Sequence, residues 1–161
     1  MKILFIQLPL TDHGYGYING NIEYAPAVIS SFIKKNYPDL KCHTLPSVLS
    51  NFCCDEVIIK YVISESPDII CFTSYLWNIE RNLNLSLLIK EKLETVKIFF
   101  GGPEISYGSV ALSSHHPQVD VFVSGEGEWF FNLFLSGKSI EYTECSGNRL
   151  AVQPPSELIS A

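Results

Sequence analysis

Short apolar runs alternate with stripes of apolar residues at helical spacing along most of this chain, and that alternation constrains the fold more than any other feature. The runs Lys2–Pro9 and Asp68–Ser74 are nearly all apolar, which is typical of strands covered on both faces. From Tyr24 the apolar positions recur three and four residues apart, as they do on one face of a helix. The segments between strands are too long for hairpins, so the pattern predicts parallel pairing with helices on both faces.

The alternation predicts five strands. They are expected at residues 2–9, 40–45, 68–74, 96–100 and 119–123, with 40–45 at a sheet edge because its apolar residues alternate. Helices are expected from Tyr24 to before Pro38, from Asp55 to before Ser66, over 83–94 and over 129–135. The segment Leu83–Leu87 alternates like a strand, but the length of the whole stretch and the helix formers that follow favour a helix.

Composition excludes several functional classes. With 47% hydrophobic and 17% charged residues among 161, the chain has the profile of one folded domain. A net charge of -6 gives no basic surface for nucleic acid. No apolar run approaches the length of about 20 residues that spans a bilayer, and no signal peptide is apparent, so we expect a cytoplasmic chain without a membrane partner. The five cysteines form no C-x-x-C pair, so we expect reduced thiols and no metal site.

Small or polar residues follow three of the expected strands: Ser74, Gly101–Gly102 and Gly125–Glu128. The carboxyl ends of parallel strands meet at one rim of the sheet, where ligands of such folds bind. Glycine lets a ligand approach the backbone closely, although a simple turn also explains Gly101–Gly102. Ser74 also suits a helix N-cap, and the acidic residues after Gly125 suit a helix N-terminus. Neither a G-x-x-x-x-G-K-[ST] loop nor a G-x-G-x-x-G motif after the first strand is present.

In order and spacing, these three elements resemble the cobalamin-binding domain at the N-terminus of many cobalamin-dependent radical S-adenosylmethionine enzymes. The resemblance extends from Met1 to about Leu135. It implies a flavodoxin-like (Rossmann-like) α/β fold, with a five-stranded parallel sheet and cobalamin across its carboxyl rim. By resemblance, Ser74 and Leu76 contact the dimethylbenzimidazole base, and Gly101 and Gly102 let the nucleotide tail pass close to the backbone. The residues implied in cofactor binding are Ser74, Leu76, Gly101, Gly102, Gly125, Glu126 and Gly127, with no catalytic residue among them.

The chain departs from the best-known cobalamin domains in its first loop. Those domains carry D-x-H-x-x-G, whose histidine is the lower cobalt ligand, whereas Asp12 and His13 are adjacent here. His13 is therefore not assigned as a ligand, and we expect cobalamin to bind without a protein ligand to the metal. His115–His116, which precede a proline, are expected in a surface loop.

The chain also lacks the C-x-x-x-C-x-x-C motif that holds the [4Fe-4S] cluster of radical S-adenosylmethionine enzymes. We therefore expect residues 1–138 to form the cobalamin-binding domain, and residues 139–161 to form a hairpin and a linker. The linker is expected to lead to a C-terminal radical S-adenosylmethionine domain, which would hold the iron-sulfur cluster and S-adenosylmethionine. The expected function is presentation of the corrinoid to that domain, for methyl transfer or related radical chemistry.

Two alternatives keep the fold and change the function. The domain can be a degenerate scaffold that binds no cobalamin and serves substrate recognition or domain docking. A flavin mononucleotide domain is the other alternative, but it requires a Ser/Thr-rich phosphate loop, and Leu8–Tyr17 has only Thr11 of that kind. The aromatic residues expected to pack on the corrin edge, on a neighbouring domain or in the core are Tyr15, Tyr17, Tyr75 and Trp77.

Overall fold

Strands in which nearly every residue is buried form the centre of the molecule. The computed structural model describes residues 1–10, 22–106, 112, 114–145 and 148–154. Its strands are β1 (Lys2–Ile6), β2 (Lys41–Thr44), β3 (Ile69–Thr73), β4 (Lys97–Gly101), β5 (Val121–Ser124), β6 (Tyr142–Cys145) and β7 (Asn148–Val152). Its helices are α1 (Tyr24–Asn36), α2 (Ser47–Phe52), α3 (Asp55–Glu65), α4 (Ile79–Lys92) and α6 (Gly127–Ser136), and residues 103–106 are also helical.

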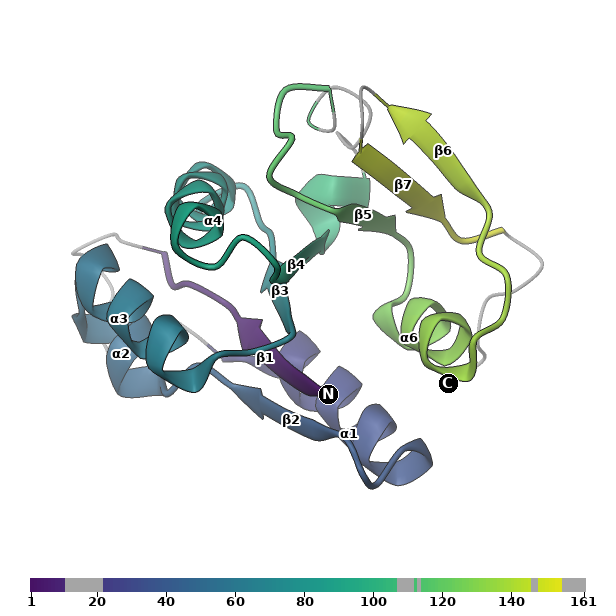
Figure 1. Ribbon diagram of the computed structural model, residues 1–161, viewed down its shortest axis with the longest axis horizontal. Helices are drawn as coiled ribbons and strands as arrows, with labels where there is room; N and C mark the ends of the chain where they lie inside the picture. Colours follow the sequence, from purple (N-terminus) through teal and green to yellow (C-terminus); the bar gives the residue numbers. More distant parts are fainter. Residues whose placement is uncertain (11–21, 107–111, 113, 146–147, 155–161) are drawn as a thin grey trace.

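The strands form one seven-stranded sheet in the order β2-β1-β3-β4-β5-β7-β6 (Figure 1). All neighbouring pairs are parallel except β6 and β7, which form an antiparallel hairpin. The strand order reverses at β1, because β2 lies on one side of it and β3 on the other. The carboxyl ends of β1 to β5 and of β7 consequently lie at a common rim.

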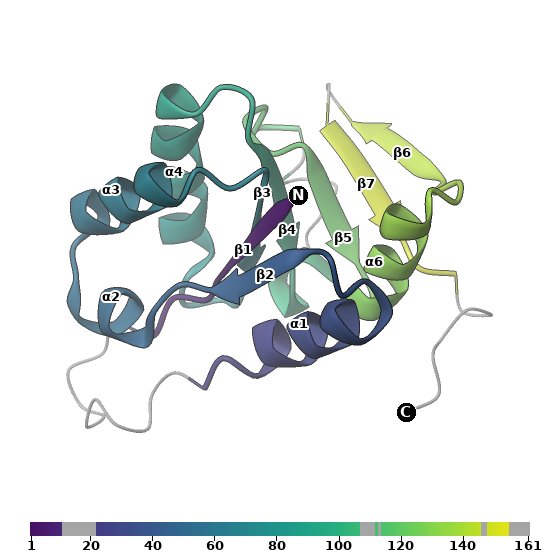
Figure 2. The ribbon, with the colours of Figure 1, turned by 60° about the horizontal axis from the view of Figure 1, so that its bottom comes forward.

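Helices cover both faces of the sheet (Figure 2). Along β3, Ile69 and Cys71 pack with α1 and α6, whereas Ile70 and Phe72 pack on the other face with α3 and α4. This alternation follows from the two-residue period of a strand. It also sets the face toward which each residue at the end of the strand points.

The structure confirms the parallel α/β fold with helices on both faces. The sheet has seven strands rather than the five implied by the resemblance, because β7 pairs with β5 and brings β6 with it. The segment 83–94 is largely helical, and its helix begins earlier, at Ile79. The short helix α2 was not expected from the sequence. In the described part of the chain, no helix has the length and apolar character needed to cross a membrane.

Candidate functional site

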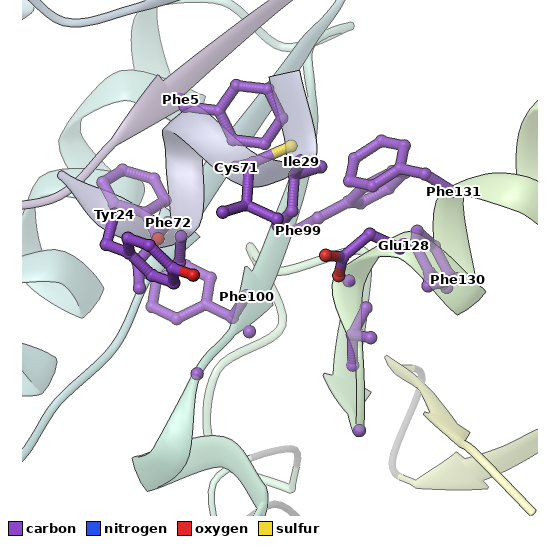
Figure 3. Close-up of a pocket in the computed structure, with 18 residues that line it drawn as sticks. Phe5, Tyr24, Ile29, Cys71, Phe72, Phe99, Phe100, Glu128, Phe130 and Phe131 are labelled. Carbon is purple, nitrogen blue, oxygen red and sulfur yellow. The ribbon is translucent and has the colours of Figure 1, made fainter. Parts of the chain in front are cut away.

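A cavity of about 240 Å³ lies at the carboxyl ends of β3, β4 and β5, between the sheet and the helices α1 and α6 (Figure 3). Its walls are mostly apolar. Phe5 and Phe99 come from the sheet, Ile29 from α1, and Phe130 and Phe131 from α6. Edge-to-face aromatic contacts hold these rings, with centroids 5.9 Å apart for Phe5 and Phe131 and 5.5 Å for Phe99 and Phe130. A flat, apolar group therefore suits the interior.

Gly101 helps to create this space. It ends β4 and lines the cavity. A Cβ atom built on Gly101 would have a single neighbour within 4 Å, the carbonyl oxygen of Val123 at 3.9 Å. The missing side chain thus leaves open volume, and no close backbone contact requires a glycine here.

At Gly102, the next residue, the backbone conformation requires a glycine. Gly102 has φ +108°, and a Cβ atom there would lie 2.6 Å from the Ser74 carbonyl oxygen. Gly125 is similar, with φ +122° and a Cβ position 2.5 Å from Cβ of Gln153. At Gly127 a Cβ atom would collide with Cδ1 of Ile29 on α1. All three glycines line the cavity. The backbone conformation already favours glycine at Gly102 and Gly125, whereas at Gly127 a shift of the Ile29 side chain could make room for a Cβ atom.

Two polar side chains line the cavity without a partner in the described part of the chain. Thr73 ends β3, is 7% exposed, and its hydroxyl makes no hydrogen bond with a described residue. Glu128, in the first turn of α6, points its carboxylate into the cavity (Figure 3). No described residue forms a hydrogen bond or ion pair with that carboxylate. Among the described residues, the Thr73 hydroxyl oxygen is not one of the buried polar atoms without a partner, so it is accessible from the cavity. A polar group of a ligand in the cavity can therefore bond to it.

Cys71 contributes a thiol to the same wall of the cavity. Complete burial raises its pKa well above the ordinary value, with the neighbouring Cys42 as a smaller cause. The thiol is therefore neutral at physiological pH and behaves as a small apolar group.

Ser74, expected at the cofactor, lies outside the cavity lining. It is fully buried, and its hydroxyl accepts a hydrogen bond from Nδ2 of Asn82 on α4 at 3.3 Å. Side chains alternate along a strand, so Ser74 points away from the face that Thr73 shares with Cys71. Because β3 is apolar and buried along its whole length, its sequence contains no alternation to show whether Thr73 or Ser74 faces the cavity.

The side chain of Leu76 also lies outside the cavity, in the turn after β3. It is 78% exposed. On either side of it, the rings of Tyr75 and Trp77 stack with centroids 4.5 Å apart and planes within 3°. This turn therefore presents an exposed apolar and aromatic surface at the rim, beside the cavity.

Glu126 forms part of the turn between β5 and α6 rather than of the cavity lining. Its backbone N–H donates to Oε1 of Gln153 at 2.7 Å, and its carboxylate accepts from Nε2 of the same side chain at 3.3 Å. Gln153 follows β7, so the end of the hairpin fixes the turn that carries Gly125 and Gly127. The turn 125–127 is thus connected to the end of the β6–β7 hairpin by the hydrogen bonds between Glu126 and Gln153.

Asn78, just before α4, fixes the rim on the opposite side. Its Nδ2 donates to the carbonyl oxygens of Leu8 at 2.9 Å and Thr73 at 3.2 Å. Its Oδ1 accepts from the backbone N–H of Tyr75 at 2.8 Å. One buried amide therefore connects the ends of β1 and β3 with the turn that follows β3.

The histidines expected to bind no metal are placed as follows. His13, with Tyr15 and Tyr17, lies outside the described residues. At His115, Nδ1 contacts Oγ of Ser114 at 2.7 Å. Among the described residues, no group of three or more His, Cys, Asp or Glu side chains is placed to hold a metal ion.

A parallel α/β domain with an apolar cavity at the carboxyl ends of its strands belongs to the class of domains that bind small molecules at this rim. Residues 23–134 match the B12 binding domain, and the chain belongs to this family. The resemblance inferred from the three strand ends is therefore confirmed.

Two curated relatives are larger enzymes. The chain is 31% identical over 78 residues to the cobalamin-dependent radical SAM methyltransferase TokK of Streptomyces tokunonensis. It is 35% identical over 69 residues to the 2-(S-pantetheinyl)-carbapenam-3-carboxylate methyltransferase of Streptantibioticus cattleyicolor. The alignments cover 48% and 43% of this chain but only 12% and 10% of the relatives. This chain thus corresponds to a small part of each relative.

Proposed function

We propose that this chain binds cobalamin, with the nucleotide arm in the cavity and the corrin ring over the rim. The observation that carries the proposal is the cavity itself, which lies at the strand ends, has apolar walls and is kept open at Gly101. When bound, the corrinoid supplies a cobalt centre that carries a methyl group or exchanges electrons. The protein's part is to hold and orient it.

The cavity residues fit the arm in chemistry as well as in shape. The phenylalanine walls suit the flat benzimidazole base, and the Thr73 hydroxyl suits a polar atom of the arm. Gly101 and Gly102 would let the arm pass near the backbone between β3 and β5. We assign a contact with the arm to Thr73 in place of Ser74, whose hydroxyl is bonded to α4.

The other expected residues receive separate roles in this proposal. Gly125 and Gly127 line the cavity wall. Glu126 holds the turn that carries both glycines. Leu76, exposed at the rim, would contact the edge of the corrin ring, with Tyr75 and Trp77 beside it.

We further propose that the domain presents the corrinoid to a C-terminal radical S-adenosylmethionine domain for methyl transfer. The names of the two relatives support this, since both are methyltransferases and one is named as a cobalamin-dependent radical SAM enzyme. The topology is compatible, because β7 runs parallel to β5 and the chain leaves the sheet at the rim that holds the cavity. The segment after Val152 would then connect the two domains.

Retention of cobalamin by the purified chain tests the proposal that the chain binds this cofactor. The chain is mixed with hydroxocobalamin, desalted and inspected for a red absorbing ligand, and the affinity is measured by calorimetry. Gly101→Leu places a side chain in the cavity without strain from a positive φ, so we expect the affinity to fall by about tenfold or more. A substitution at Gly102 is less informative, because it also distorts the backbone.

Lys41→Leu is the matched control, since it adds the same side chain at an exposed position on β2, away from the cavity. It should bind cobalamin as the parent chain does. If Gly101→Leu also binds with parental affinity, the arm lies elsewhere. A parent chain that retains no corrinoid favours the scaffold alternative.

A further inference from the structure

We infer that Glu128 shares one proton with the ring nitrogen of the corrinoid's lower base, so that the binding of cobalamin takes up a proton from solvent. This inference rests on the proposed function and concerns the same cavity. It assigns to Glu128 a role in selecting the lower base, whereas the family resemblance implies no role for this residue in cofactor binding.

The surroundings of Glu128 make its carboxylate unusual. It points into a cavity whose other described lining residues are almost all apolar (Figure 3). No Lys, Arg or His is among those lining residues. Water solvates the carboxylate while the cavity is open, and a ligand that fills the cavity displaces that water. A charge that loses its water without gaining a partner is strongly disfavoured, so the ligand has to offer one.

The lower base of cobalamin offers a nitrogen lone pair. An arm buried between the sheet and α1 and α6 would hold its base away from the cobalt, and the ring nitrogen that otherwise binds the metal would then be free. A carboxylate and a nitrogen lone pair are both acceptors, so they repel each other unless a proton lies between them. One proton from solvent, bound to either group, converts the repulsion into a charge-assisted hydrogen bond. Besides the cobalt–nitrogen bond, which would open when the base leaves the metal, no other bond forms or breaks, and the complex gains one positive charge.

The remaining ionisable groups at the cavity do not supply this proton. Cys71 on β3 stays protonated because burial raises the pKa of its thiol. Tyr24 on α1 lines the cavity but is largely exposed. Glu126, next to the cavity, is bonded to Gln153. Glu23 precedes α1; burial raises the pKa of its carboxyl, which accepts a hydrogen bond from Ser50 and is not part of the lining.

Glu128 itself lies in the first turn of α6, where the helix dipole favours a carboxylate. The proposal therefore assigns the arrival of the proton to the step in which the ligand binds. Binding that takes up one proton weakens by up to about tenfold for each unit that the pH rises above the pKa of the linked group. The cavity would also prefer a base with a ring nitrogen to one without.

The test is calorimetry of the full 161-residue chain with cobalamin in buffers of different ionisation enthalpy, which counts the protons taken up. We expect uptake of about one proton for the parent chain and none for Glu128→Gln, with affinity falling as pH rises only for the parent. Glu91→Gln, on the exposed side of α4, is the matched control and should behave as the parent. A corrinoid with phenol as its lower base has no ring nitrogen to share the proton and leaves Glu128 without a partner. It should therefore bind more weakly than cobalamin to the parent chain, and this difference should shrink in Glu128→Gln.

The outcomes separate this inference from the proposed function. Binding of cobalamin without proton uptake overturns the inference alone, as does equal uptake by the parent and Glu128→Gln. The Thr73 hydroxyl would then be the donor to the base. A parent chain that binds no cobalamin overturns the proposed function and the inference with it. Circular dichroism of Glu128→Gln confirms that the variant is folded.

Discussion

At the scale of single residues, Gly101 and Gly102 are adjacent in sequence but are glycines for different physical reasons. A Cβ atom on Gly101 meets only the Val123 carbonyl oxygen, at 3.9 Å. A Cβ atom on Gly102 meets the backbone of Ser74 at 2.6 Å, and its φ of +108° is unfavourable for any other residue. The first glycine serves the cavity, and the second serves the packing of the β3 and β4 ends.

This difference predicts a large loss of stability for one alanine variant and a small change for the other. Gly102→Ala should lower the free energy of unfolding by about 2 to 4 kcal/mol, because it combines a strained φ with a backbone collision. Gly101→Ala should change it by less than about 1 kcal/mol. Urea unfolding of both variants measures the difference. Equal destabilisation would mean that Gly101 is also required by packing.

The strand end at the cavity could be predicted from the sequence, but the residue that faces the cavity could not. Thr73 lines the cavity and Ser74 does not, and the contact of either residue with the cofactor stays a prediction. A shift of one residue moves a side chain to the other face of a sheet. Glu128 was noted only as a helix-start residue, since the direction of its carboxylate depends on how α6 packs on the sheet.

At the scale of elements, α4 has a buried polar stripe toward the sheet. Asn78, which caps its start, and Asn82 and Ser86 within it are each no more than 1% exposed. Asn82 donates to the Thr73 carbonyl oxygen at 3.2 Å, and Ser86 accepts from Gln118 at 3.3 Å. The stripe explains why Leu83–Leu87 alternates like a strand, since its polar residues divide between solvent and a buried network. The stripe thus fixes the end of β3 and, through it, the shape of the rim.

Asn78 is the member of this network with the most contacts to the rim. Asn78→Ala removes hydrogen bonds to the Leu8 and Thr73 carbonyls and to the Tyr75 N–H. The Thr73 carbonyl keeps the bond from Asn82, whereas the Leu8 carbonyl and the Tyr75 N–H lose their bonds to Asn78. We expect a loss of about 2 to 4 kcal/mol in the free energy of unfolding. Asn84→Ala, at an exposed position on the same helix, is the control and should change it by less than about 0.5 kcal/mol. Thermal or urea unfolding measures the stability of both variants. Similar losses would contradict the conclusion that the Asn78 amide stabilises the rim.

Long elements could be predicted and short or non-local ones could not. The five core strands and their helices have clear periodic patterns. Helix α2 has only six residues, too few for a helical stripe. The sequence predicts a hairpin within residues 139–161, but the addition of β7 to the sheet depends on pairing with the distant β5, which local pattern does not encode.

At the scale of the whole molecule, the functional features converge on one rim. The topology brings the ends of β3, β4 and β5 together, and α1 and α6 cover the space beside them. Exposed apolar side chains lie at the same end of the sheet, on segments that follow β1, β2 and β3. They are Leu10, Phe52, Leu76 and Trp77. The sequence predicts that these strand ends meet, but the size of the cavity depends on the packing of two helices far apart in the chain.

The central claim is that the cavity holds the nucleotide arm of the corrinoid. The most direct test is the ratio of affinities for cobalamin and for cobinamide, which has the corrin ring without the nucleotide arm. The account predicts that cobalamin binds about a hundredfold more tightly or better, because filling an apolar cavity with an aromatic base contributes several kcal/mol. Equal affinities for the two ligands would contradict it.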